Sequence, residues 1–165
     1  MKKIYKKITL LFFLLCISSC TGYEPLFSSS KLQFEIAKYS IKSDKKLGNN
    51  IYSKLYRLSQ SNKNNPEAQS LNFEIEATKS KSPTVKNSAG KILEYKIDLN
   101  TKITVSDYLT DNVILNQNFI LSSSYKVQDQ YSETAKLENK TLENLLNKTY
   151  EDLLIKLSEN LTPKW

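Results

Sequence analysis

Residues 93–105 read LEYKIDLNTKITV, and this stretch decides the fold class. Side chains suited to a buried strand face occupy every odd position, namely Leu93, Tyr95, Ile97, Leu99, Thr101, Ile103 and Val105. Charged or polar residues and Thr104 fill the even positions. A period of two kept this long predicts a strand with one dry face and one wet face, as antiparallel sheets usually have. The sequence therefore indicates a sheet that is covered on one side only.

Strands are predicted on both sides of this stretch. Leu71 to Ala77 alternates in the same way, and the polar run Lys79 to Pro83 then breaks the pattern, which predicts a loop. Asp107 to Asn112 supplies turn residues, and Val113 to Tyr125 is predicted to return as the second strand of a hairpin. Three apolar side chains of that strand share one face: Leu115, Phe119 and Leu121.

Helical periodicity marks two further segments. Ser43 or Asp44 is expected to cap a helix from about Lys45 to Ser59, followed by turn residues 62–66. Its apolar positions recur at spacings of four, four and three, at Leu47, Ile51, Leu55 and Leu58. A second helix is predicted from Asp129 or Ser132 to near Pro163. Its apolar stripe comprises Leu142, Leu145, Leu146, Leu153, Leu154, Leu157 and Leu161.

The predicted elements fit one compact arrangement. A short strand around Leu32 to Ile36 precedes the first helix, so the order is strand, helix, three strands, helix. We expect an α+β two-layer sandwich, with a four-stranded, mostly antiparallel sheet and two helices packed on one face. The stripe of the last helix is interpreted as covering the sheet, although a partner-binding zipper has the same pattern. Residues 31–162 are predicted to form this single domain.

The N-terminal residues have the features of a secretion signal. Four lysines precede the apolar stretch Ile8 to Ile17, which has the length of a signal-peptide core and about half that of a membrane-spanning helix. The sequence Ile17-Ser18-Ser19-Cys20 that follows is similar to a bacterial lipobox. An ordinary signal peptide with an incidental cysteine is the alternative.

The lipobox predicts a lipid-anchored protein. Residues 1–19 are then a signal peptide that is removed, and Cys20 becomes the first residue, carrying covalent diacylglycerol and an N-acyl chain. Residues 20–30 would form the tether. Thr21 follows the cysteine where an aspartate would favour retention at the inner membrane, so we expect the outer membrane, on its periplasmic side.

Composition excludes several classes of function. Without residues 1–19 the chain has 146 residues and 20 basic against 17 acidic side chains, a net charge of +3, which removes the main support for nucleic-acid binding. There is no histidine, and Cys16 leaves with the signal, so histidine-dependent catalysis and histidine or cysteine metal sites are excluded. Glu74 and Glu76 alternate with apolar residues as on a wet strand face. We therefore expect no enzyme activity and no cofactor.

The motifs in their order resemble those of a known family. Cys20 is followed by Gly22-Tyr23-Glu24-Pro25-Leu26-Phe27, then by the helix start Leu47 to Ile51, the strand entry Glu94 to Lys96 and the serine- and tyrosine-rich stretch Ser122 to Ala135. Together with the order of elements, this is similar to the LptE family of lipopolysaccharide-assembly lipoproteins, and especially to its alphaproteobacterial members. Thr21 departs from the pattern as an inserted residue.

The resemblance implies an accessory subunit without chemistry of its own. LptE proteins plug the LptD β-barrel of the outer membrane, assist its assembly and help lipopolysaccharide to reach the outer leaflet. For contact with lipid A phosphates we select the basic residues Lys79, Lys81, Lys86 and Lys91, which also suit a solvated loop. Tyr23, Pro25, Leu26 and Phe27 are expected to pack where the tether meets the barrel or bilayer, or else to close the core.

Three other functions remain open at the level of sequence. The first is a lipoprotein that carries lipid in an apolar cavity between sheet and helices. The second is a general structural lipoprotein of the envelope. The third, a small lipoprotein enzyme, is disfavoured by the missing histidine and thiol.

Overall fold

The computed structural model describes residues 32–63 and 65–161. Its elements follow in the predicted order: β1 (Phe34–Ser43), α2 (Lys45–Gln60), β2 (Gln69–Lys86), β3 (Ile92–Asp107), β4 (Val113–Lys126) and α3 (Tyr131–Leu161). The predicted signal peptide, the lipobox with Cys20, and the tether residues Tyr23, Pro25, Leu26 and Phe27 lie outside the described residues.

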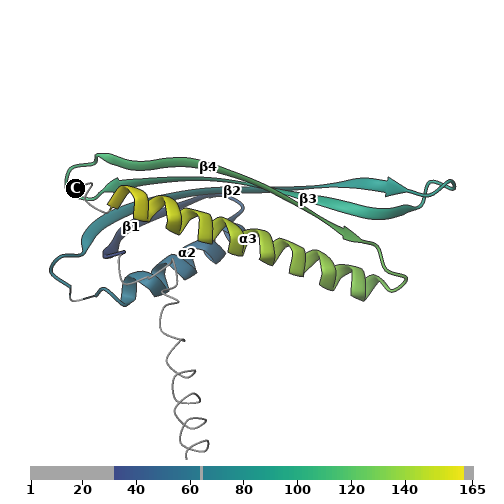
Figure 1. Cartoon of the computed structure of the whole chain (residues 1–165), viewed down its shortest axis with the longest axis horizontal. Coiled ribbons are helices and arrows are strands. Elements are labelled where there is room, and N and C mark those ends of the chain that lie inside the picture. Colours follow the sequence, from purple (N-terminus) through teal and green to yellow (C-terminus); the bar gives the residue numbers. More distant parts are fainter. Residues whose placement is uncertain (1–31, 64, 162–165) are drawn as a thin grey trace, which may run out of the picture.

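The four strands form one sheet in the order β1-β2-β3-β4. β2, β3 and β4 pair antiparallel, whereas β1 pairs parallel with β2, because α2 carries the chain back between them. Both helices lie on the same side of this sheet (Figure 1). The predicted α+β sandwich with two helices on one face is confirmed, and the sheet is mixed.

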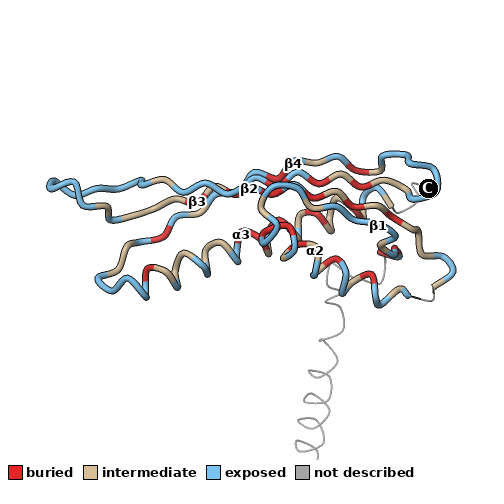
Figure 2. Tube along the Cα trace, turned by 180° about the vertical axis from the view of Figure 1, so that it is seen from behind, coloured by how far each residue is buried: buried red, intermediate tan, exposed pale blue. Residues whose placement is uncertain are grey.

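The core lies between the sheet and the helices, as the alternation in β3 predicts. Ile97, Leu99, Ile103 and Val105 are all buried. Leu93, at the start of the same strand, is instead exposed, because β2 and β3 continue beyond the part of the sheet that the two helices cover (Figure 2). The dry face is therefore dry only over the middle and one end of the sheet.

The predicted loop at Lys79 to Pro83 was wrong. β2 continues through it to Lys86, and its pairing with β3 runs without a register shift as far as Pro83. The polar residues broke the apolar pattern because this part of the strand has left the covered core. The backbone hydrogen bonds between β2 and β3 form whatever the polarity of the side chains, so the strand continues without the apolar pattern. The first strand is likewise longer than predicted and reaches Ser43.

Helix α2 begins at a capping residue. The Asp44 side chain accepts hydrogen bonds from the backbone N–H groups of Lys46 and Leu47, at 2.9 and 3.2 Å, which satisfies two donors of the first turn. Gly48 in the next part of the helix is buried. A Cβ atom placed on Gly48 would lie 2.3 Å from Cγ2 of Ile41 in β1. Glycine therefore lets this helix approach the edge strand closely.

We expect Gly48→Ala to destabilise the protein by about 1 kcal/mol, since overpacking costs about 1–3 kcal/mol and the better helix propensity of alanine returns at most about 1 kcal/mol. In an Ile41→Ala background the clash is gone, and Gly48→Ala is expected to become stabilising by up to about 1 kcal/mol. Urea denaturation of the four proteins measures both changes. The same sign in both backgrounds would contradict this account of Gly48.

Helix α3 covers the sheet with its C-terminal half. Leu145, Leu146, Leu153 and Leu157 of the predicted stripe are buried in the common core, which confirms that this stripe packs on the protein itself. The N-terminal half of the helix diverges from the sheet and is mostly exposed (Figure 2). Neither described helix is long and apolar enough to cross a membrane.

The core contains one buried hydroxyl group that is expected to lower the stability of the protein. Thr101 is fully buried between Ala77 and Phe119, and its Oγ1 atom has no hydrogen-bond partner among the described residues. We expect Thr101→Val to raise the free energy of unfolding by about 1 kcal/mol, because the variant removes an unsatisfied polar atom and keeps the shape.

Thr149 gives the matched control. It is equally buried, but its hydroxyl donates to the Leu145 carbonyl oxygen at 2.9 Å, so Thr149→Val is expected to be neutral or destabilising. Thermal or urea unfolding compares the two variants, and a Thr101→Val protein less stable than its parent would count against the argument.

Candidate functional site

The predicted basic residues lie on the hairpin of β2 and β3 that projects beyond α2 (Figure 1). Lys79, Lys81 and Lys86 belong to β2, and Lys91 closes the turn at the end of the hairpin, where its backbone oxygen accepts from Asn87 N at 2.9 Å. The turn requires Gly90, whose φ is +80°. The four lysines are thus held on an ordered hairpin and do not form one cluster.

Lys81 alone is built into a contact between hairpin and helix. Its Nζ atom lies 2.5 Å from Oε2 of Glu138 in α3, and the same oxygen accepts the Tyr125 hydroxyl at 2.8 Å. The ammonium also sits 4.3 Å from the centre of the Tyr95 ring. This cluster, which we call the Lys81 cluster (Lys81, Tyr95, Tyr125 and Glu138), joins β2, β3, β4 and α3 by one cation.

The electrostatics of the cluster favour both charged forms. The hydrogen bond from Lys81, followed by smaller contributions that include the charge of Lys79, holds the pKa of Glu138 below its ordinary value. Burial lowers the pKa of Lys81, but the hydrogen bonds and charges of Glu138 and Tyr125 outweigh it, so that pKa is raised overall. Burial is also the main reason that the pKa of Tyr125 is raised. Lys81 and Glu138 are therefore an ion pair at neutral pH.

We expect Glu138→Gln to lower the free energy of unfolding by roughly 0.5–1 kcal/mol at pH 7, the range of partly exposed pairs. A carboxyl with a depressed folded pKa stabilises above its ordinary value of 4.5, and the contribution is lost as the pH falls through the lower folded pKa. The difference between the two proteins should shrink below pH 4.5. Glu143→Gln, at an exposed site of α3, is the control, and equal effects of both variants in urea would contradict the prediction.

An open cleft lies beside the Lys81 cluster, where α3 diverges from the hairpin. Its volume is about 310 Å³, at the low end for small-ligand pockets. The lining mixes aromatic rings with charged and amide groups, and comprises Lys81, Tyr95, Val127, Gln128, Asp129, Tyr131, Thr134, Ala135 and Glu138. The charge of Lys81 is neutralised by Glu138, so the cleft does not present this lysine as a free cation. It can instead bind a polar group through hydrogen bonds and contacts with aromatic rings.

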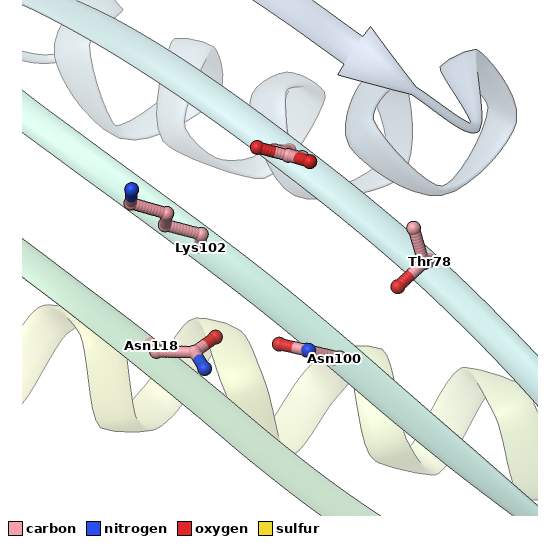
Figure 3. Close-up of a pocket in the computed structure, with 5 residues that line it drawn as sticks. Thr78, Asn100, Lys102 and Asn118 are labelled. Carbon is pink, nitrogen blue, oxygen red and sulfur yellow. The ribbon is translucent and has the colours of Figure 1, made fainter.

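The opposite face of the sheet is polar. Figure 3 shows Thr78 of β2, Asn100 and Lys102 of β3, and Asn118 of β4, with both helices behind the strands. With Glu76 they line a hollow of about 360 Å³. Nearby charges are paired: Lys42 with Glu74 at 2.6 Å, and Lys96 with Asp98 at 3.1 Å. This outer face can hydrogen-bond to a polar partner without a large net charge.

The structure distinguishes among the predicted contact residues. Lys79 and Lys81 are near Glu138, whereas Lys86 and Lys91 stand at the far end of the hairpin and, within the described residues, pair with no carboxylate. The sequence analysis missed Glu138 and Tyr125 as partners of Lys81. The odd-numbered alternation of β3 did place Tyr95 on the inner face, but nothing in the pattern links that position to a residue on α3.

Comparisons with known proteins identify the fold. No family model and no curated protein matches the sequence. Among solved structures, the minor lipoprotein from Acinetobacter baumannii is similar with a TM-score of 0.56 and 14% identity, over 81% of this chain and 98% of that one. The rare lipoprotein B from Shewanella oneidensis is similar with a TM-score of 0.52 and 14% identity, over 74% and 94%. A lipoprotein B from Nitrosomonas europaea has a TM-score of 0.56 and 15% identity, over 81% and 88%. The chain therefore has the fold of these lipoproteins.

Proposed function

We propose that this chain is an outer-membrane lipoprotein of the LptE type, a subunit of the lipopolysaccharide-transport machinery that is anchored through Cys20 on the periplasmic side. One coincidence carries the proposal: a lipobox at Ile17 to Cys20 precedes a domain with the fold of rare lipoprotein B over 94% of that protein. The described residues supply surfaces and ion pairs, which suits a subunit that works by binding.

The partner in this proposal is an LptD-like β-barrel. The lumen of such barrels is polar and hydrated. The outer face of the sheet matches it, because Asn100, Lys102 and Asn118 project from it and the nearby carboxylates of Glu74 and Asp98 are paired with lysines. A domain that buries its apolar side chains beneath its own helices and presents this face to the lumen loses little hydration on insertion. The chain then plugs the barrel and assists its assembly.

Lipopolysaccharide is the second partner, and Lys86 and Lys91 are its strongest candidate contacts. Lys81 is committed to Glu138, and Lys79 lies close to the same carboxylate. Lys86 and Lys91 keep their charges free among the described residues and are carried on an ordered hairpin. Ammonium groups held this way attract the phosphates of lipid A.

Recovery of the barrel is the test of the proposal. The tagged, acylated protein is purified from detergent-solubilised outer membrane, with Cys20→Ser and an unrelated lipoprotein as controls. We expect a large β-barrel protein to co-purify in near-equal amount with the native protein only. Recovery no better than in either control would refute the LptE-type function.

A separate double variant tests the proposed contact with lipopolysaccharide. Lys86→Glu/Lys91→Glu is expected to keep the barrel and to lower the co-purified lipopolysaccharide several-fold, because repulsion replaces attraction at the phosphates. Lys45→Glu/Lys46→Glu at the start of α2 changes the same charge in a place where acidic residues favour the helix. Equal losses in both double variants would show that only net charge matters.

A further inference from the structure

The turn between β3 and β4 carries three exposed apolar side chains. Tyr108, Leu109 and Val113 are 51%, 83% and 63% exposed. A single exposed apolar residue is ordinary on any protein surface, but three within six positions concentrate exposed apolar side chains at one end of the molecule. We call this surface the apolar tip (Tyr108, Leu109 and Val113).

The turn that bears the tip is held in one conformation. Oδ1 of Asp107 accepts from the backbone N–H groups of Leu109 and Thr110, at 3.0 and 2.9 Å, and from the Thr110 hydroxyl at 2.9 Å. The hydrogen bond from Gln69, and then those from Thr110, lower the pKa of Asp107 to about 2, so these bonds persist at any physiological pH. These hydrogen bonds hold the backbone of a turn in which the Leu109 side chain is exposed.

The tip lies next to the place where the N-terminal part of the chain enters the domain. Gln69 bridges the two: its backbone N–H donates to the Gln33 carbonyl oxygen at 3.1 Å, and its side chain donates to Asp107 at 2.8 Å. Tyr108 N also donates to the Ser70 carbonyl oxygen at 2.9 Å. The turn and the C-terminal end of α3 lie at one end of the molecule, and the β2–β3 hairpin lies at the other (Figure 1).

We propose that, before a barrel encloses the domain, the apolar tip inserts into the surface of the bilayer beside the lipid on Cys20, and so fixes the domain with its hairpin pointing away from that leaflet. The inference rests on the lipid anchor of the proposed function. Leu32 is 12 positions after Cys20, so the chain between them spans at most about 43 Å. The anchor therefore keeps the tip at a high local concentration near the headgroups.

The tether explains why the bilayer is the partner proposed for the apolar tip. Three side chains are too few to hold a free protein on a membrane, but they suffice to orient a protein whose attachment is already provided, because the second contact is then intramolecular. Tyr108 suits the interface, with an apolar ring and a polar hydroxyl. Asp111 beside the tip favours zwitterionic over anionic headgroups.

The test measures the depth of one label in the membrane. Leu109→Cys is labelled with a polarity-sensitive fluorophore in the full acylated protein, whose Cys16 has left with the signal and whose Cys20 is alkylated, so the new thiol is the single one. The protein is reconstituted without a barrel in phosphatidylcholine vesicles with brominated acyl chains. We expect the Leu109 label to lose about half of its fluorescence to the lipid bromine.

Tyr131→Cys is the matched control, since Tyr131 is 86% exposed and starts α3 near the hairpin end. Its label should be unaffected by the brominated lipid, and a label at Val113→Cys should repeat the Leu109 result. Vesicle-bound protein whose Leu109 and Tyr131 labels behave alike would overturn the inference and leave the anchor intact. Protein that does not float with the vesicles would overturn both. Quenching that needs an added barrel would assign the tip to the barrel instead.

Discussion

The Cys20→Ser variant is expected to take up no palmitate and to be lost from the outer-membrane fraction. Each buried methylene of an acyl chain contributes about 0.8 kcal/mol, so two or more chains attach a small domain essentially permanently, whereas three exposed side chains at the apolar tip do not. The variant also lacks the thiol that is acylated. Cell fractionation and metabolic labelling with palmitate measure the two effects.

Cys16→Ser is the control for this prediction. It changes the other cysteine of the chain, within the predicted signal core, and should leave labelling and membrane attachment as they are. Palmitate incorporated in Cys20→Ser, or lost in Cys16→Ser, would contradict the lipobox. Since the pull-down compares the same Cys20→Ser protein, its fractionation tells whether a lost barrel results from a lost anchor.

The second large effect is expected in the core. Ile75 is fully buried on β2 and pairs with Ile103, so Ile75→Ala should cost about 2–5 kcal/mol of unfolding free energy through lost transfer energy and the cavity left behind. Such a loss is a large fraction of the stability of an ordinary domain. Urea denaturation followed by circular dichroism measures it.

Ile120 provides the same residue type on the other side of the sheet. It lies on β4, is 68% exposed and belongs to the polar outer face, so Ile120→Ala is expected to cost less than about 1 kcal/mol. Equal losses of unfolding free energy in Ile75→Ala and Ile120→Ala would show that the helices do not cover the face of the sheet that carries Ile75.

The fold could be predicted because it depends on local alternation. The period of two in β3 fixed which residues face the helices, and the leucines of α3 fixed what covers them, so the layers followed without long-range information. The hairpin beyond the core could not be predicted in this way. From Lys79 to Lys86 the strand is held by backbone hydrogen bonds to β3, and those bonds leave no trace in the polarity of the side chains.

The candidate site was predicted only in part, for a related reason. Composition and spacing identified the basic residues, but they gave no means to see that Glu138, 57 positions after Lys81, would neutralise one of them. The apolar tip was equally invisible, because Tyr108 and Leu109 lie in a turn where no periodicity applies. Pairings across a sheet and a distant helix are properties of the folded chain.

The parallel pairing of β1 with β2 has a consequence for the order of folding. β1 precedes the rest of the sheet in the chain, yet it has no neighbour until β2 has formed, and it joins the sheet through a crossover instead of a tight hairpin. The meander β2-β3-β4 can assemble from contacts between consecutive strands, so we expect it to form before β1 and α2 dock. Until then β1 and α2 keep their apolar side chains uncovered, which makes this the segment of the domain most exposed to aggregation during folding.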